Sequence, residues 1–248
     1  SAQSLLLWYP SVTAESDGYI RKAVKIESGA KSALDPHARH SVIPYLADDL
    51  PDLDLTVANV TIVDAERTFW DKVAGNGLFA AVHGSFGSLM PSFASVRYDN
   101  NFFVHMICHP FEQMASCLDL VAGGVLDRHR NLRVAFLESG LGWLEYWLER
   151  MDEHFEAMRH LVPALKRKPS DIFRAQCFIS IEADEAHRLP RLQELGLEKC
   201  VFWGADYPHY DCTYPGAVHE LEENLAPLDR SLADRIRHGN AERFLGLA

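Results

Sequence analysis

The segment LRVAFLESGLGWLEYWLERMDEHF, residues 132–155, contains a strand followed directly by a helix. Residues 132–137 form a short apolar run of the kind that buried strands have. Large apolar side chains then recur at helical spacing between residues 142 and 160: Trp143, Tyr146, Trp147, Met151 and Phe155. A strand and an amphipathic helix in succession predict one β-α unit. We interpret the aromatic stripe of the helix as core or subunit interface and not as a cofactor site.

The same alternation continues in both directions from this unit. The predicted strands are residues 55–63, 78–83, 132–137, 177–181 and 199–204, with 101–107 as a possible sixth. The predicted helices are residues 64–75, 111–129, 142–160 and 189–195, and the chain after residue 204 is expected to be mainly helical. The strands are apolar throughout instead of alternating, which is typical of a parallel sheet covered by helices.

Strands that alternate with helices fit either a doubly wound open sheet or a closed barrel. No G-x-G-x-x-G motif follows a strand and no P-loop is present, which counts against nucleotide-binding open sheets. His83, Glu138 and Asp206 each stand at the C-terminal end of a predicted strand, where barrel enzymes collect their catalytic groups. We therefore predict an α/β fold of the (β/α)8 TIM-barrel type, in which these three side chains converge within roughly 10 Å.

Residues 1–54 differ in pattern from residues 55–248, although we assign the whole chain, residues 1–248, to a single barrel domain. Ser4–Tyr9 and Ile20–Ile26 are candidate strands. About ten residues separate them, which is short for a crossover between parallel strands. We expect these segments to pair antiparallel or to pack outside the barrel. The barrel would then be incomplete or irregular on its N-terminal side.

The composition limits the possible partners of the chain. Of the 248 residues, 48% are hydrophobic and 24% charged, which is ordinary for a globular protein of this length. A net charge of -11 disfavours binding to nucleic acid or to an anionic membrane surface. The five cysteines form no C-x-x-C motif, so we expect most of them to be small buried residues in a reduced, cytoplasmic protein.

Three ionisable side chains at strand ends are the main candidates for catalysis. His83 precedes a Gly-Ser loop, which suits a metal ligand or general base, but also a core histidine bonded to a backbone carbonyl. Glu138 follows four apolar residues, where a carboxylate needs a partner or a metal. It could equally stabilise the N-terminus of the next helix. Asp206 stands in a similar position, and Pro208 restricts the turn that follows it.

Three further histidines are candidates for contact with a substrate. His105 and His109 are four residues apart, a spacing that would give one metal-binding face on a helix. Pro110 argues against a helix through both, so we expect His105 in a loop and His109 at a helix start. We predict substrate contact rather than metal ligation for both. His209 lies close enough to Asp206 in the sequence to position a substrate as well.

Three long segments resemble one family. They are FFVHMICHPFEQMASCLDLVAGGVLDRHRNLRVAFLESGLGWLEYWLERMDEHFE (residues 102–156), VFWGADYPHYD (201–211) and NAERFLGL (240–247). They resemble the amidohydrolase-related metal-dependent hydrolases, the relatives of aminocarboxymuconate-semialdehyde decarboxylase and γ-resorcylate decarboxylase. The resemblance covers residues 55–248. It implies a (β/α)8 barrel with one divalent metal, zinc or manganese, acting on small carboxylic or aromatic substrates.

The resemblance also implies roles for individual residues. His83 matches a metal-binding histidine of the family, and Asp206 matches the aspartate that binds the metal or its activated water. Glu138 stands where the decarboxylases have a catalytic histidine, so the proton donor differs. The family's first strand carries an H-x-H pair of ligands, and this chain contains no H-x-H. The resemblance thus supplies two ligands, whereas catalytic zinc sites normally have three.

We expect a hydrolase that uses metal-activated water, with Glu138 and Asp206 as acid and base. Decarboxylation by the same family is the first alternative. A barrel remnant without catalysis and a metal-free enzyme built on His83 and Glu138 are two others. We also expect a homodimer or larger assembly, because an incomplete barrel leaves strand edges to cover.

Overall fold

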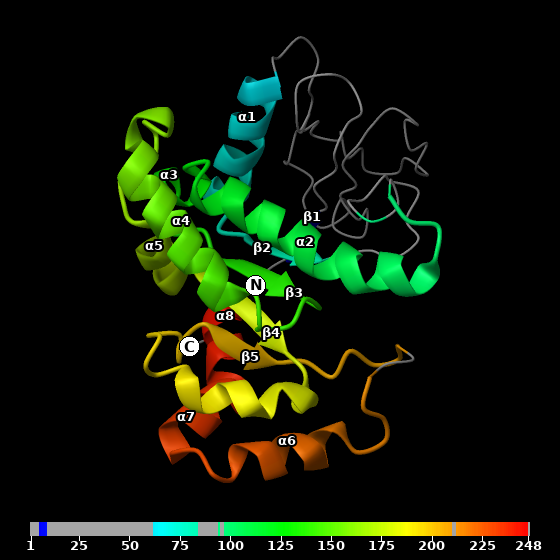
Figure 1. Cartoon of the computed structure of the whole chain (residues 1–248). Coiled ribbons are helices and arrows are strands. Elements are labelled where there is room, and N and C mark those ends of the chain that lie inside the picture. The colour runs from blue at the N-terminus through cyan, green and yellow to red at the C-terminus, as the bar shows by residue number, and fades with distance from the viewer. Residues whose placement is uncertain (1–4, 9–61, 84–93, 95–96, 210–211, 248) are drawn as a thin grey trace.

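The computed structural model describes residues 5–8, 62–83, 94, 97–209 and 212–247, which contain a sheet of parallel strands (Figure 1). The strands are β1 (Leu5–Trp8), β2 (Phe79–His83), β3 (Val134–Leu137), β4 (Cys177–Ile181) and β5 (Val201–Trp203). They lie side by side in chain order, and every pairing is parallel. This order is that of a barrel wall, whereas a doubly wound sheet reverses its order part-way.

Helices connect and cover these strands (Figure 1). They are α1 (Ile62–Gly75), α2 (Asn101–Val121), α3 (Val125–Arg128), α4 (Leu144–Met158), η2 (Arg159–Leu161), α5 (Pro169–Gln176), η3 (Ala183–Arg191), α6 (Ala217–Leu225), α7 (Arg230–Asp234), η4 (Arg235–Gly239) and α8 (Asn240–Leu245). Of the predicted stripe on α4, Met151 and Phe155 are buried in the core, whereas Tyr146 is 56% exposed. None of the described helices combines the length and hydropathy that crossing a bilayer requires.

Strands β2, β3, β4 and β5 are largely buried on both faces, and alternate residues enter two separate hydrophobic clusters. Ala80, Val82 and Phe136 belong to the larger, outer cluster, which the surrounding helices share. Phe79, Ala81 and Ala135 belong to a smaller, inner cluster, which Phe244 of α8 completes. His83 has the same parity as Phe79 and Ala81. Its side chain therefore stands on the inner face, at the end of the strand.

Most of the predicted strands are confirmed. The predicted strands 78–83, 132–137, 177–181 and 199–204 correspond to β2, β3, β4 and β5. The predicted strand 55–63 is wrong at its end, because Ile62 and Val63 begin α1. A short apolar run alone does not separate a strand from a helical turn. Residues 55–61 lie outside the described residues.

The start of α2 corrects two expectations. Residues 101–107 are helical and not a sixth strand, and the helix begins at Asn101 instead of residue 111. The side chain of Asn100 accepts a hydrogen bond from the backbone N–H of Phe102 at 2.9 Å and caps this end. Pro110 lies within the helix. The buried positions on both sides of it, including Cys108 and Gln113, keep the helix continuous despite the lost backbone hydrogen bond.

Two other expectations are corrected. The predicted helix 189–195 is not an α-helix: residues 189–191 end the 3-10 segment η3 and residues 192–195 form turns. Pro190 lacks an N–H and disfavours the α conformation at Leu189. Ser4–Tyr9 does not pack outside the sheet, since β1 pairs parallel with β2, Leu5 opposite Phe79. The long connection between these two strands has the length that a crossover needs. Ile20–Ile26, its expected antiparallel partner, lies outside the described residues.

The cysteines behave as predicted. All five are free thiols, and four of them are buried. Burial raises the pKa of Cys108 to about 11 and that of Cys200 to about 12. These thiols therefore remain protonated at neutral pH and contribute as small apolar groups.

Candidate functional site

The predicted convergence of His83, Glu138 and Asp206 is confirmed at the C-terminal ends of the strands. His83 is the last residue of β2, Glu138 follows β3 directly, and Asp206 lies three residues after β5. His83 Nε2 lies 2.7 Å from Glu138 Oε1, and Glu138 also shares a hydrogen bond with Asp206. A single carboxylate thus joins residues from three strand ends.

Glu138 and Asp206 share an unusual backbone conformation. Their φ angles are 56° and 54°, and they alone have positive φ among the described non-glycine residues. The left-handed region is sparsely populated by residues with a Cβ atom and carries a cost in conformational energy. Glu138 takes this conformation directly after β3, and Asp206 takes it three residues after β5, in the loop that holds its carboxylate beside that of Glu138. The two residues predicted to be catalytic are therefore the two strained ones.

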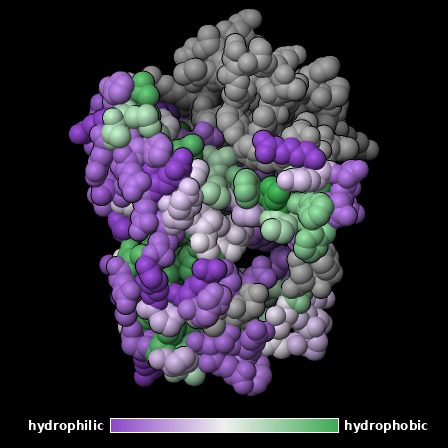
Figure 2. Space-filling model, in the orientation of Figure 1, coloured by the Kyte–Doolittle hydropathy of each residue, from purple (hydrophilic) through white to green (hydrophobic). Residues whose placement is uncertain are grey.

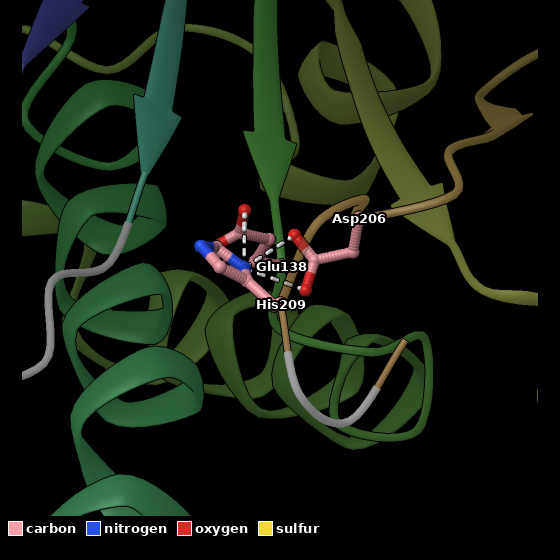
Figure 3. A group of neighbouring side chains, drawn as sticks. All are labelled: Glu138, Asp206 and His209. Carbon is pink, nitrogen blue, oxygen red and sulfur yellow. Dashed lines mark hydrogen bonds and ion pairs between the residues drawn. The ribbon is translucent and has the colours of Figure 1, made fainter. Parts of the chain in front are cut away.

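His209 completes a compact group with these carboxylates (Figure 3). Its Nδ1 lies 2.9 and 2.8 Å from the two carboxylate oxygens of Asp206, and 3.8 Å from Glu138 Oε1. A turn brings it there, in which the backbone N–H of His209 donates to the carbonyl of Asp206 at 3.0 Å. The side chain of His209 is 54% exposed, so one side of the group is open to solvent or substrate.

The two carboxyl groups have opposite pKa shifts. Burial raises the pKa of Asp206, and its hydrogen bond to Glu138 adds to this, giving a value of about 6. Burial also opposes ionisation of Glu138, but hydrogen bonds with His83 and Asp206 and the charges of His83 and His109 outweigh it, lowering the pKa of Glu138 to about 2. Between about pH 2 and pH 6 the pair therefore holds one proton, mainly on Asp206, while Glu138 is ionised. Such a separation is typical of acid and base partners in active sites.

Helix α2 places His109 near Glu138 and His105 beside His109. His109 Nδ1 lies 3.8 Å from Glu138 Oε2, and its ring centroid is 6.4 Å from that of His83. The ring centroid of His105 is 5.3 Å from that of His109. The expectation that His105 lies in a loop is wrong, because both residues are inside α2 and four residues apart. The helix therefore adds two imidazoles beside the strand ends.

Three donors in this site lie close enough to hold one metal ion. Glu138, Asp206 and His209 each offer a ligand atom, and these atoms lie within 4.8 Å of one another. One nitrogen and two carboxylate oxygens suit zinc or manganese, and three protein ligands are the usual number at a catalytic zinc site. The sequence pointed to His83 and Asp206 as the ligands. The geometry instead groups Asp206 with Glu138 and His209, and His83 contacts Glu138.

Two residues near the site gave no signal in the sequence. Gln113 of α2 is fully buried, and its Nε2 donates to the carbonyls of Val82 and Leu137. Ser180 of β4 accepts a hydrogen bond from the backbone N–H of Glu138 at 3.2 Å. Both side chains are neutral. Only the apolar residues of their segments predicted structure, so neither side chain stood out in the sequence.

Comparison with known proteins identifies the family. A family model described as amidohydrolase matches residues 24–247 of the chain. The chain belongs to the amidohydrolase family. No curated protein matches it. The family, together with the sequential parallel strands, establishes an α/β fold of the TIM-barrel type, of which the described residues form an open arc of five strands.

Several solved structures are similar to this amidohydrolase. 5-Carboxyvanillate decarboxylase LigW from Sphingomonas paucimobilis has 20% sequence identity and a TM-score of 0.62, over 73% of this chain and 53% of that one. An amidohydrolase from Mycobacterium avium subsp. paratuberculosis K-10 has 16% identity and a TM-score of 0.63, over 74% and 46%. A dihydroxybenzoic acid decarboxylase from Polaromonas sp. JS666, with bound manganese and the inhibitor 2-nitroresorcinol, has 20% identity and a TM-score of 0.57, over 72% and 53%. The amidohydrolase chain thus spans about half the length of these structures.

Proposed function

We propose that this amidohydrolase is a metal-dependent decarboxylase of small aromatic carboxylic acids. The observation that carries the proposal is the group of Glu138, Asp206 and His209, whose ligand atoms lie within 4.8 Å of one another, with His83 Nε2 at 2.7 Å from Glu138 Oε1. Decarboxylation breaks a C–C bond, releases CO₂ and requires a proton at the carbon that keeps the electron pair. An imidazole within hydrogen-bond distance of a carboxylate, as His83 is of Glu138, suits that transfer. Two of the similar structures are decarboxylases of aromatic acids, which supports the substrate class.

The residues of the site have separate tasks in this proposal. Glu138, Asp206 and His209 would hold the metal, which supplies a Lewis acid that polarises a substrate oxygen. Glu138 is bonded to His83 and lies near His109, so protons can pass between this carboxylate and the imidazoles. His105 and His109 would contact the substrate from the side of α2. His209 has an exposed side chain and would stand where the substrate enters.

The proposal is tested by incubating the manganese-loaded chain with 2,6-dihydroxybenzoate and 5-carboxyvanillate and measuring released CO₂. We expect release with at least one aromatic acid, and one solvent deuterium in the product at the carbon that lost the carboxyl group. Glu138→Gln should lower the rate by about 100-fold or more, as expected for loss of a general acid or base. Glu153→Gln, an exposed position of α4, should leave it unchanged. Equal rates in wild type and Glu138→Gln would refute the assignment.

Hydrolysis is the second candidate, because Glu138 is ionised near neutral pH and can accept a proton from water. The two reactions give different products from one substrate. An aromatic acid that also carries an ester group yields CO₂ in the first case and an alcohol in the second. Formation of the alcohol with full retention of the carboxyl group would assign the site to hydrolysis.

A further inference from the structure

Gln113 makes the same kind of contact with two neighbouring strands. It lies on α2, is fully buried, and its Nε2 donates to the carbonyl of Val82 at 2.8 Å and to that of Leu137 at 2.9 Å. A carboxamide nitrogen carries two hydrogens, and each is used here by a different strand. Val82 immediately precedes His83, and Leu137 immediately precedes Glu138. One side chain therefore ties together the backbone on which both site residues stand.

The peptide group between Leu137 and Glu138 is held from both sides by side chains. Its carbonyl accepts from Gln113, and its N–H donates to Ser180 Oγ at 3.2 Å. The β3–β4 ladder ends one residue earlier, where Phe136 pairs with Ile179. Side chains thus take over where the backbone ladder stops. At this point Glu138 turns to a φ of 56°, a conformation that persists only if its surroundings enforce it.

We propose that Gln113 and Ser180 are positioning residues. They hold the Leu137–Glu138 peptide so that the Glu138 carboxylate lies beside His83 and beside Asp206 and His209, the other two metal-binding donors. Neither touches the carboxylate itself, and both act through the backbone. Only the part of the inference that concerns metal binding rests on the proposed function. The 2.7 Å contact between His83 and Glu138 is a property of the chain alone and tests the inference separately.

The chain offers a matched control for Gln113. Gln176 of α5 is also buried, and its Nε2 donates to the carbonyls of His129 and Leu132, at 2.8 and 3.0 Å. These carbonyls precede β3, at the end of the strand opposite to Glu138. Gln176→Met removes two bonds of the same kind as Gln113→Met, far from the site, together with the bond that Gln176 Oε1 accepts from Arg167 at 2.7 Å. Ser116→Ala, which removes a buried hydroxyl bonded to the carbonyl of Glu112, is the control for Ser180→Ala.

For all four variants, the experiment determines the crystal structure, the Mn²⁺ affinity by calorimetry and the thermal midpoint of unfolding. We expect Gln113→Met and Ser180→Ala to move the Glu138 carboxylate out of hydrogen-bond distance of His83, and to weaken Mn²⁺ binding about 10- to 100-fold, as for other groups that orient ligands. Gln176→Met should lower the thermal midpoint as Gln113→Met does, with the His83–Glu138 contact and the affinity unchanged.

Two results would overturn the inference. One is an intact His83–Glu138 contact in both Gln113→Met and Ser180→Ala. The other is an equal loss of Mn²⁺ affinity in Gln176→Met, which would indicate general destabilisation. If Gln113→Met does not fold, Ser180→Ala decides alone, because it removes only one hydroxyl. If the wild type binds no Mn²⁺, the metal-dependent function fails, while the crystal structures still decide whether these residues position Glu138.

Discussion

Asp206 and Glu138 show how two chemically similar residues acquire different roles from their surroundings. Asp206 contacts one imidazole, that of His209, and a second carboxylate. Glu138 lies near His83, His109 and His209 together. More positive charge gathers around Glu138, so it is the group that ionises first. The proton of the pair consequently resides on Asp206.

At the residue scale, we expect Asp206→Asn to stabilise the metal-free chain at high pH. The pKa of Asp206 is raised from 3.8 to about 6 on folding. A raised acid pKa contributes stability below pH 3.8, and this contribution is lost as the pH rises through about 6. Asparagine does not ionise, so the variant does not lose this stability as the pH rises. Urea unfolding in the presence of EDTA should show the variant gaining about 1–2 kcal/mol relative to wild type between pH 4 and pH 8.

Asp171→Asn is the control for this pH profile. Its side chain is 65% exposed and faces Arg174 on the surface of α5. We expect the stability difference between this variant and wild type to change little over the same range, since exposed ion pairs contribute little. A stability difference for Asp206→Asn that stays constant from pH 4 to pH 8 would contradict the shared-proton description.

The sequence revealed the charged residues of the site but not the neutral ones that support them. A carboxylate directly after an apolar strand is costly, which made Glu138 and Asp206 visible. His209 was assigned to the substrate, because its approach to the carboxylates depends on a turn closed by one backbone hydrogen bond. Gln113 was invisible, since a neutral residue in a helix carries no signal until the helix is placed against the strands.

At the scale of elements, one buried carboxylate connects α3 to the segment before α5. The side chain of Asp127 is 2% exposed and bonds the side chain of Arg167 at 2.7 Å and its backbone N–H at 3.1 Å. It also accepts from Arg130, two residues after the end of α3. Burial opposes ionisation of Asp127, but the bonds from Arg167 and from the backbone of Lys166 prevail and lower its pKa. The carboxylate is thus a structural anchor.

We expect Asp127→Ala to lower the free energy of unfolding by about 2–4 kcal/mol at pH 7, because it leaves the partly buried guanidinium of Arg167 without its carboxylate. A lowered pKa contributes stability above the unfolded value of 3.8 and loses it as the pH falls. The difference between variant and wild type should therefore shrink below about pH 4. Chemical unfolding at pH 3 and pH 7 measures both quantities. A loss under about 1 kcal/mol at pH 7 would show that Asp127 is no anchor.

Helix α2 illustrates why element boundaries are harder to predict than element types. The apolar period of residues 111–121 was clear, whereas the preceding turns contain two histidines and exposed aromatic residues. Pro110 was read as a boundary, since proline usually stands near one. The strands were easier to find, because a sheet buried on both faces needs continuous apolar runs.

At the scale of the whole molecule, metal binding should raise the stability of the fold. A ligand that binds only the folded chain stabilises it by about 2.7 kcal/mol when its concentration is 100 times Kd. We expect Mn²⁺ or Zn²⁺ to raise the thermal midpoint by several degrees and EDTA to reverse the change. Glu138→Gln, which removes one of the three donors, should reduce the shift. An unchanged midpoint with either metal would exclude a metal site in this chain.

The exposed surface of α2 carries hydrophobic side chains, and we propose that it binds a second copy of the chain. Hydrophobic side chains gather over α2 (Figure 2), where Phe102 and Met106 are 70% and 65% exposed. Exposed apolar patches of this kind commonly mark interfaces. We expect a homodimer or larger by light scattering at micromolar concentration, and a monomer for the double variant Phe102→Lys/Met106→Lys. Val218→Lys, at an exposed position of α6, is the control and should not change the mass. A monomeric wild type would contradict this expectation.

The order of the strands has a consequence for biosynthesis. Each of β3, β4 and β5 pairs with the strand that precedes it in the chain. During translation every new strand therefore meets a partner already outside the ribosome, and the sheet can grow in the order in which it is made. Until the next strand has been synthesised, however, the most recent strand is an unpaired edge of the sheet. Premature arrest of synthesis would leave such an edge exposed, so truncated forms that end after β3 or β4 should aggregate more readily than the whole chain.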